Sequence, residues 1–277
     1  MNPKLIFWFN DHFPLLGLPK ILQEKYNFDV YAILDVADKH KKFFQEQKLI
    51  KFSKIWYFHD YISKTAEKPD TEYLKLIEKK YKVDLGLLAS NDRFFNKFNE
   101  FYKFSPDEIL LILEQECKLF EKILDELKPD FIIMTITNVH HDHLFYKICQ
   151  ARGVKILILW QSNLRGRYII SSRIDLIDHA EYNEKHNFGS FSEIQNYIKK
   201  YDTTALITAH TKTFQNSKIK YLQSALKYLF SDNSNVKTHF TYYGRTKFAV
   251  LRITLINEIK KKYREYFINK NLIRDIE

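Results

Sequence analysis

The sequence predicts an α/β protein: a Rossmann-like parallel sheet flanked by helices, followed by a basic helical C-terminal extension. Three observations lead to this prediction. Short apolar runs alternate with helical patterns along the first two thirds of the chain. Several of these runs are unbroken, as in strands that are covered on both faces of a parallel sheet. Finally, residues 105–163 read as one complete helix–strand–helix–strand unit.

This central unit opens with a capping box. Ser105 can accept a hydrogen bond from the backbone of Glu108, and Pro106 occupies the first helical position. Apolar residues then recur at steps of three and four, so one broad face of the helix must be buried. Pro129 is expected to end this helix.

The rest of the unit is predicted from its apolar runs and from the residues that end its elements. A buried strand is expected at 131–136, and a second helix at about 141–152. Gly153 suits the left-handed position after that helix, and 154–160 forms the next strand. In an open parallel sheet the loops at the carboxyl ends of the strands form the ligand crevice, so 137–142 and 161–167 are the loops to examine.

The remaining elements are weaker. Before the unit, the pattern predicts strands at 5–9, 29–34, 50–58 and 85–89, and helices at 15–26, 39–47 and 72–81. After it, helices are expected at 191–201, 214–230 and 246–269, the last of them amphipathic and strongly basic. These patterns divide the chain into a Rossmann-like domain, 1–190, and a mainly helical basic extension, 191–277, that packs on it.

Composition supports a protein with a substantial core. The 277 residues are 45% hydrophobic and 16% aromatic, and no apolar run approaches the length of a membrane span. Both cysteines, Cys117 and Cys149, lie on apolar helix faces, where a small buried thiol is the ordinary interpretation. A reducing, cytoplasmic location is therefore expected.

Charge is distributed unevenly. Residues 1–150 carry 22 Lys and Arg against 23 Asp and Glu, whereas residues 151–277 carry 22 against 11. The second half therefore has a net charge of +11. A face of this kind could bind phosphates of nucleic acid, an anionic membrane surface, or an acidic partner.

The run from Asn138 to His143 contains three histidines and one aspartate. Four consecutive helical residues fan through about 300°, so at most two of His140, His141, Asp142 and His143 could bind one ion. We therefore predict no metal site and no cofactor. The preferred interpretation is that Asn138, His140 and His141 bind a hydroxyl-rich or anionic acceptor at the helix start. The alternative is that Asn138 caps the helix, Asp142 complements its positive N-terminus, and the histidines are polar surface or cleft residues.

Asn10, Asp11 and His12 follow the first strand. An aspartate and a histidine at a crevice mouth can supply a general base near neutral pH, and we assign the catalytic role to His12 or Asp11. The alternative is an N-cap aspartate and a solvated histidine. The loop lacks the glycines of a dinucleotide-binding G-x-G-x-x-G, and no P-loop, G-x-S-x-G, H-E-x-x-H or CxxC pair occurs.

Arg93, Gln161 and Arg165 also follow expected strands. Arginine can hold phosphate or carboxylate through forked hydrogen bonds, so these residues complete the predicted acceptor-binding set with Asn10. A solvated basic loop is the alternative.

Several short motifs together resemble the N-terminal half of capsule and surface-polysaccharide biosynthesis proteins, which are similar to GT-B glycosyltransferases. The resemblance covers most of the chain. The motifs that carry it are Glu114-Gln115-Glu116 with Phe120, Lys128 to Ile133, His143 to Tyr146, Cys149 to Val154, and Arg167 to Ser171.

The resemblance implies a single GT-B-type N-terminal domain that binds a glycan or lipid-linked acceptor and supplies the base. A second domain would bind the nucleotide-sugar donor. The sequence ends at Glu277, about where that domain would begin. We therefore expect either a fragment or a partner chain that supplies the donor side.

The expected function is acceptor binding in a polysaccharide glycosyltransferase at the inner face of a membrane, where the basic C-terminal helix could meet anionic lipid. Two other classes remain open. A nucleic-acid-binding protein would use the basic half, but no recognised binding motif supports it. A non-catalytic scaffold would pair with another chain.

Overall fold

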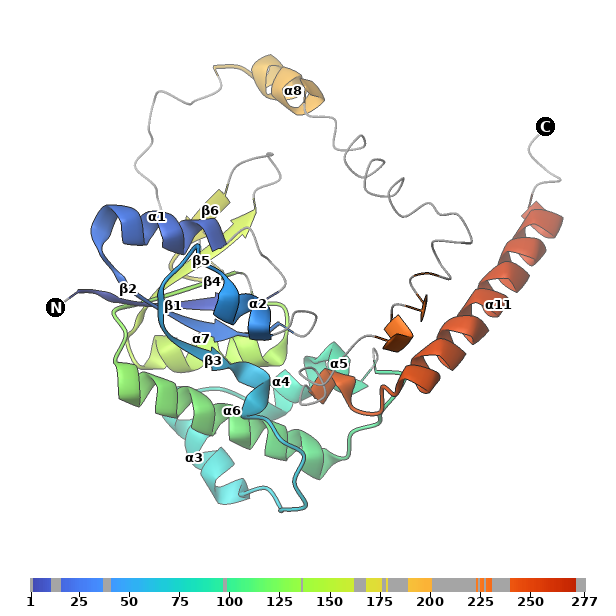
Figure 1. Cartoon of the computed structure of the whole chain (residues 1–277), viewed down its shortest axis with the longest axis horizontal. Helices are drawn as coiled ribbons and strands as arrows, with labels where there is room; N and C mark the ends of the chain where they lie inside the picture. The colour runs from blue at the N-terminus through green and yellow to red at the C-terminus, as the bar shows by residue number, and fades with distance from the viewer. Residues whose placement is uncertain are drawn as a thin grey trace.

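The computed structural model describes most of the chain, and its described part is an α/β sheet protein (Figure 1). The described residues are 2–10, 16–36, 41–96, 99–135, 137–161, 168–175, 178, 189–200, 223, 225–226, 228–230 and 240–272. The strands are β1 (Lys4–Phe9), β2 (Asp29–Leu34), β3 (Phe52–Tyr57), β4 (Phe131–Thr135), β5 (Lys155–Gln161) and β6 (Tyr168–Ser171). The helices are α1 (Gly17–Tyr26), α2 (Lys41–Glu46), α3 (Thr71–Tyr81), α4 (Leu85–Asn91), α5 (Arg93–Asn96), α6 (Pro106–Leu127), α7 (His140–Ala151), α8 (Phe191–Lys200) and α11 (Lys247–Leu272).

These strands form one sheet in the order β3-β2-β1-β4-β5-β6. The first five are parallel, and β6 pairs antiparallel with β5 at the edge. The chain therefore builds outward from β1 to β3, then returns to place β4 on the other side of β1. This order confirms the predicted Rossmann-like fold.

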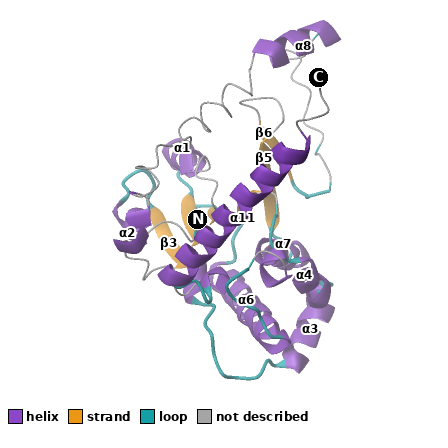
Figure 2. Ribbon diagram, turned by 90° about the vertical axis from the view of Figure 1, so that its right-hand side faces the viewer, coloured by secondary structure: helices purple, strands orange, loops and turns teal. Residues whose placement is uncertain are grey.

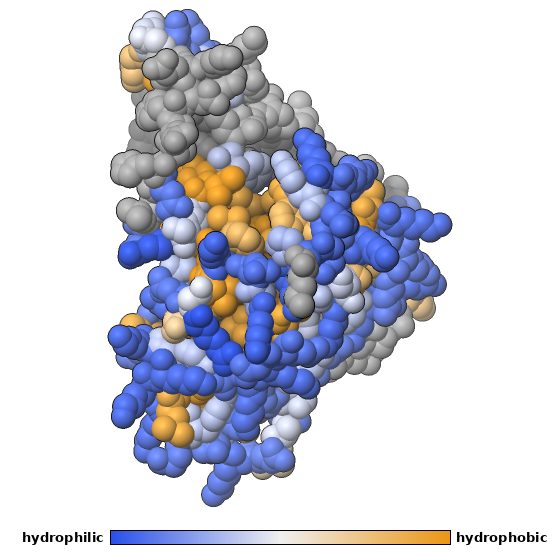
Figure 3. Space-filling view, turned by 90° about the vertical axis from the view of Figure 1, so that its left-hand side faces the viewer, coloured by the Kyte–Doolittle hydropathy of each residue, from blue (hydrophilic) through white to orange (hydrophobic). Residues whose placement is uncertain are grey.

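Helices cover both faces of the sheet (Figure 1). One apolar cluster includes Phe7 and Phe9 of β1 and residues from α1 and α2. The larger cluster joins Trp8 of β1 to α3, α6 and α7, with Phe120 and Phe145 completely buried. Side chains alternate between the two clusters along β1, which is why its apolar run is unbroken. On the face drawn in Figure 3, the described surface around the exposed apolar areas is mostly hydrophilic.

Helix α6 has the predicted N-terminal cap. Ser105 Oγ accepts from Glu108 N, and a Glu108 carboxylate oxygen accepts from Ser105 N at 2.9 Å. The helix ends at Leu127, where Lys128 adopts a left-handed conformation with φ 49° before Pro129. Gly153, with φ 70°, takes the left-handed position after α7 as predicted.

One element was predicted wrongly. Residues 85–89 were expected to form a strand, but they lie in α4. Asp84 caps this helix by accepting a hydrogen bond from Leu87 N at 2.7 Å. Leu85 is buried and Leu87 is 56% exposed, while Leu88 and Ala89 pack against the core. This burial at steps of three and four has the helical period, and Asp84 is the N-cap that the sequence reading missed.

Part of the C-terminal segment packs on the sheet domain. Phe240 is completely buried, and Tyr243 contacts the rings of Tyr102 and Phe104. Gly244 has φ 73°, and a Cβ at this position would lie 2.3 Å from the carbonyl oxygen of Phe101. Only glycine therefore fits here without displacing backbone.

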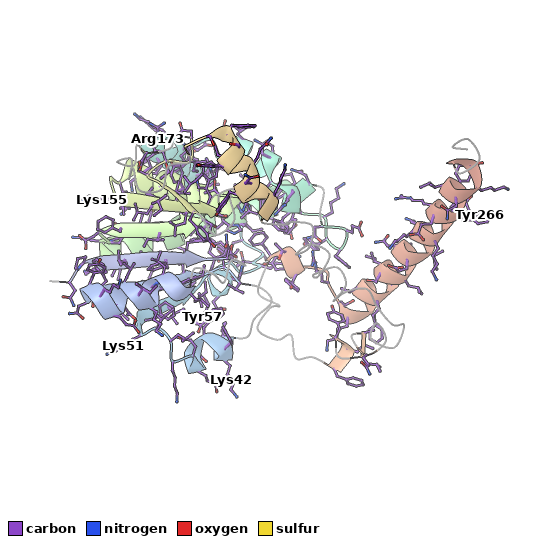
Figure 4. The ribbon with its side chains drawn as sticks, turned by 90° about the horizontal axis from the view of Figure 1, so that it is seen from above. Lys42, Lys51, Tyr57, Lys155, Arg173 and Tyr266 are labelled. Carbon is purple, nitrogen blue, oxygen red and sulfur yellow. The ribbon has the colours of Figure 1, made fainter. Side chains whose placement is uncertain are left out.

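Beyond this contact, α11 extends away from the sheet domain in the views of Figures 1 and 4. Its side chains are exposed along most of the helix, including Tyr266 near its far end. Figure 2 shows the same helix crossing in front of the domain when viewed from its side. The expected boundary near residue 190 stays a prediction, and most of the helix expected at 214–230 lies outside the described residues.

Glu108 links the N-terminus of α6 to the preceding loop. Its interactions there are expected to make the stability of the fold depend on pH. Its carboxylate also accepts from Tyr102 and lies 3.1 Å from Lys64 Nζ. Burial opposes ionisation, but the hydrogen bonds from Ser105 and Tyr102 and the charge of Lys64 lower the pKa of Glu108 to about 2. A carboxyl group with a lowered folded-state pKa stabilises the fold above its unfolded pKa, and this contribution is lost as the pH falls toward 2.

We expect Glu108→Gln to lower the free energy of unfolding by about 1 kcal/mol at pH 6, after allowance for solvent screening. Glutamine can keep the capping hydrogen bond, so the difference isolates the charge. Urea denaturation of wild type and variant from pH 6 to pH 2.5 should show the difference shrinking as pH falls. A constant difference over that range would contradict the assignment.

Candidate functional site

Polar side chains gather where the strands end at the carboxyl edge of the sheet. Asn10 follows β1, Asp35 follows β2, and His59 follows β3 by two residues. Asn10 Nδ2 donates to Thr135 Oγ1, at the end of β4, at 2.9 Å. Since β1 and β4 are neighbours from which the chain runs outward in opposite directions, this hydrogen bond spans the topological switch point of the sheet.

Beneath this edge, His140 joins three elements. Its backbone N–H and its Nδ1 both lie against Asp92 Oδ2, at 2.9 and 2.7 Å, and its Nε2 lies 2.9 Å from Glu116 Oε1. The other oxygen of Asp92 accepts from Phe94 N, so one carboxylate holds the first turns of α5 and α7. The side chains of His140, Asp92 and Glu116 are inaccessible to solvent.

Asp35 is shared by two further histidines. Its Oδ1 accepts from His59 Nε2 and its Oδ2 from His141 Nε2, both at 2.6 Å. The ring of His141 stacks on Phe58 at a centroid distance of 4.8 Å and lies 5.9 Å from Trp8. The bonds to Asp35 therefore fix which nitrogen of each imidazole faces the carboxylate.

The carboxylates and imidazoles shift one another's pKa values. Burial would raise the pKa of Asp92, but hydrogen bonds and charge from His140 lower it to about 2. Burial would lower the pKa of His140, but the charge of Glu116 and the hydrogen bonds to both carboxylates raise it to about 10. His140 therefore holds its proton more strongly than a free imidazole does.

Burial and charge also oppose each other in setting the pKa values of Asp35, His141 and His59, and burial prevails only at His59. Burial opposes ionisation, but His141 and His59 hold the pKa of Asp35 well below its usual range, and Asp35 raises the pKa of His141. In contrast, burial outweighs Asp35 at His59 and lowers its pKa. Burial and the nearby charge of Asp35 raise the pKa of Asp142 to about 6.

Phe240 closes the network from the C-terminal segment. Its ring centroid lies 5.6 Å from that of His140, 5.9 Å from that of His141 and 6.0 Å from that of His59. The histidine network is therefore an interior feature that the C-terminal segment covers.

Two sets of side chains in this region have metal-ligand spacing. One set is Glu116, His140 and His141, and the other is Asp35, His141 and Asp142. In each set, one ligand atom per residue lies within 4.8 Å of the others. All members except Asp35 are buried.

The structure brings several predicted site residues together. Asn10 lies at the switch point, and the backbone N–H of Asn138 donates to Asp142 Oδ2 at 3.3 Å. His140 and His141 lie beneath the rim, 3% and 2% exposed. Two parts of the alternative are therefore wrong: His140 and His141 are not surface residues, and Asn138 is not the cap, because Val139 is the N-cap residue and no side chain caps the helix there. Asp142 does lie in the first turn, as that alternative expects, and His143 is only partly buried.

Two of the other predicted site residues, Arg93 and Gln161, lie at the ends of secondary-structure elements. The expectation that Arg93 follows a strand is wrong, because helix α4 precedes it. Arg93 begins α5, and its guanidinium lies 5.4 Å from the Phe94 ring centroid. The backbone of Gln161 ends β5, opposite Tyr168. Asp11, His12 and Arg165 lie outside the described residues, so their catalytic and binding roles stay predictions.

Sequence reasoning missed Asp35, His59 and Glu116 as members of the network. Asp35 and His59 each follow an expected strand closely, so the rule that selected Asn10 could have selected them. Glu116 lies between Leu113 and Phe120 on the buried side of α6. A carboxylate in that position is a signal, because a buried charge needs a partner.

Comparison with known proteins adds no assignment: the sequence matches no family model and no curated protein.

The buried position of Asp92 predicts a large effect of its removal. Asp92→Ala leaves the ring Nδ1 and the backbone N–H of His140 without their shared acceptor. We expect the free energy of unfolding to fall by about 3–5 kcal/mol, as measured by chemical denaturation. Asp84→Ala, which removes the cap of α4, is the matched control and should cost about 1 kcal/mol. Equal losses in the two variants would contradict the network.

Proposed function

We propose that this chain carries the acceptor-side domain of a GT-B-type polysaccharide glycosyltransferase. The observation that supports the proposal best is the parallel sheet with polar residues at the switch point between β1 and β4. In open α/β sheets this is where ligands bind. The resemblance of several short motifs to those of capsule and surface-polysaccharide proteins favours the same class.

In this proposal, the loop after β1 supplies the chemistry. Asn10 orients an acceptor hydroxyl, and Asp11 or His12 removes its proton as the acceptor oxygen attacks the anomeric carbon of the donor sugar. The bond to the nucleotide's phosphate oxygen breaks on the opposite side. A second α/β domain facing this edge would hold the nucleotide-sugar, and Arg93, Arg165 and Gln161 would contact polar or charged groups of the substrates.

The test uses the chain together with its donor-binding domain. We expect Asp11→Ala combined with His12→Ala to lower kcat by about 10²–10⁴-fold, because the transition state loses its base. Asn10→Ala should mainly raise KM for the acceptor, whereas Asn271→Ala, near the end of α11, should change neither constant. Release of nucleotide on addition of acceptor is the measurement. Full activity of the double variant would reject the assignment of the base.

Helix α11 supports a membrane-facing position for this domain. It carries seven basic residues and two acidic ones, Glu258 and Glu265. Large apolar side chains are also exposed on it, among them Phe248, Ile259 and Tyr266. No helix in the described part of the chain has both the length and the apolar content to cross a bilayer. Exposed basic and apolar side chains together favour binding to an anionic lipid surface, where a lipid-linked acceptor would lie.

We expect the protein to float with anionic liposomes at low salt and to be released at high salt. Replacement of Lys260, Lys261 and Lys262 by Glu should reduce the bound fraction at least tenfold, since each lysine near such a surface contributes about 1 kcal/mol. Replacement of Lys42, Lys48 and Lys51, which are exposed on the sheet domain, makes the same charge change and should have much less effect. Equal losses in both variants, or no flotation of the wild type, would contradict this role of α11.

A further inference from the structure

The interior network contains three ligand atoms that converge from two helices. Glu116 of α6 and His140 and His141 of α7 each offer one ligand atom, and these atoms lie within 4.8 Å of one another. All three residues are at most 3% exposed. The run of histidines supplies two ligands, the most that its helical geometry allows, and α6 supplies the third from 24 residues earlier in the chain.

Two of these side chains have polar atoms without a hydrogen-bond partner among the described residues. They are Glu116 Oε2 and His141 Nδ1, each with less than 1 Å² accessible to solvent. A buried polar atom left in this way destabilises the folded state, and more so where the group is charged. A cation that accepts electron pairs from both atoms would remove that cost.

In each ring, the nitrogen that faces away from the other proposed ligands is hydrogen-bonded to a carboxylate, as in histidines that bind metals. His140 Nδ1 lies 2.7 Å from Asp92, and His141 Nε2 lies 2.6 Å from Asp35. Histidines that bind a metal almost always donate their other N–H to a carboxylate or carbonyl, which fixes the tautomer and orients the ring. This arrangement places His141 Nδ1, which has no hydrogen-bond partner among the described residues, and His140 Nε2, which lies 2.9 Å from Glu116 Oε1, on the inner side.

The distances are compatible with a tetrahedral ion. Ligand atoms about 2.1 Å from such an ion lie about 3.4 Å apart. The ligand atoms of the set lie within 4.8 Å of one another, a separation that includes the required value, and His140 Nε2 would exchange its 2.9 Å hydrogen bond to Glu116 Oε1 for the ion. Small side-chain movements would therefore form the site.

We propose that Glu116, His140 and His141 bind one divalent cation of the zinc class, with Asp92 and Asp35 as the carboxylates that orient the two histidines. Two imidazoles and one carboxylate are donors that Zn²⁺ accepts readily, whereas Mg²⁺ and Ca²⁺ prefer oxygen ligands alone. Such a three-ligand set leaves a fourth position for water or another ligand. The proposal goes beyond glycosyl transfer, because it is tested by metal content and does not depend on any reaction.

The competing set, Asp35, His141 and Asp142, is less suitable. His141 Nε2 already lies 2.6 Å from Asp35 Oδ2, and Asp142 Oδ2 accepts from the backbone of Asn138. Binding an ion there through Nε2 would break the hydrogen bond that fixes the His141 ring. In the proposed set, the hydrogen bond between His140 Nδ1 and Asp92 and the one between His141 Nε2 and Asp35 are both retained.

The test measures metal content and stability of the purified full-length chain. The protein is stripped with a chelator, equilibrated with Zn²⁺, passed through a desalting column and analysed for metal. We expect one Zn²⁺ per chain and a higher thermal midpoint for the zinc-loaded form than for the stripped form, because binding to the native state stabilises it. Zinc affinity should fall as pH is lowered, since protons compete for the two ring nitrogens.

Variants assign the ligands. Glu116→Gln should lower zinc affinity at least tenfold, and Asp92→Asn should lower it by about 10–100-fold through loss of ring orientation. Glu114→Gln is the matched control: Glu114 lies on the same helix, is also buried, and binds Lys118 and the backbone of Asp70, so zinc affinity should be unchanged. If Glu116→Gln fails to fold, the Co²⁺ spectrum of the wild type decides, because a four- or five-coordinate spectrum supports the site and an octahedral, water-like spectrum opposes it.

Two results would overturn the proposal. One is a wild-type chain that holds no stoichiometric zinc and has the same thermal midpoint with and without it. The other is loss of binding in Asp142→Asn with full binding in Glu116→Gln, which would assign the ion to the competing set.

Discussion

The pairing of β1 with β4 is the contact on which the described architecture depends. It joins residues more than 120 positions apart: Lys4 N donates to Asp130 Oδ2 at 2.8 Å, Asp130 N donates to Lys4 O at 3.0 Å, and Leu5 stands opposite Phe131. Without this pairing the strands would form two separate three-stranded sheets, β3-β2-β1 and β4-β5-β6. Because this pairing places α6 and α7 against the back of β1, it also creates the interior in which the histidine network lies.

The network shows how burial and charge are balanced in that interior. Taking carboxylates and imidazoles out of water is costly, and mutual hydrogen bonds offset this cost only when the geometry is good. Here each of Asp35 and Asp92 accepts from two donors or more, at 2.6–2.9 Å. Phe240 then packs against the three imidazoles and helps to exclude water from them. A segment far along the chain thereby contributes to the same interior as α7.

The sequence predicted the sheet well because its signals are local. The capping box at Ser105, the stop at Pro129, the glycine after α7 and the unbroken apolar runs each depend on neighbouring residues. The error at 85–89 has the same origin: Leu85, Leu87 and Leu88 suit a buried strand, and only the cap from Asp84 distinguishes a short helix. Periodicity cannot separate the two over so few residues.

The network could not be predicted in the same way, because its members meet only through the sheet order. The sequence gathers His140, His141 and Asp142, but Asp35 and Asp92 come from loops about 105 and 50 positions away in the chain. Burial of the histidines depends on α6 and Phe240 and leaves no local pattern. Glu116 is the exception, since a charged residue inside an apolar helical stripe marks a place where a partner must approach.

The two proposals concern different layers of the same edge. The proposed transferase surface lies on the rim, where Asn10 donates to Thr135. The proposed cation lies one layer deeper, between α6 and α7, where His140 and His141 are almost inaccessible. The first turn of α7 connects the layers, because Thr137 contacts His143 and Asn138 contacts Asp142 while His140 and His141 face inward. An ion at the inner layer would therefore fix the start of α7 and hold the rim in place without touching a substrate, so either proposal can fail while the other stands.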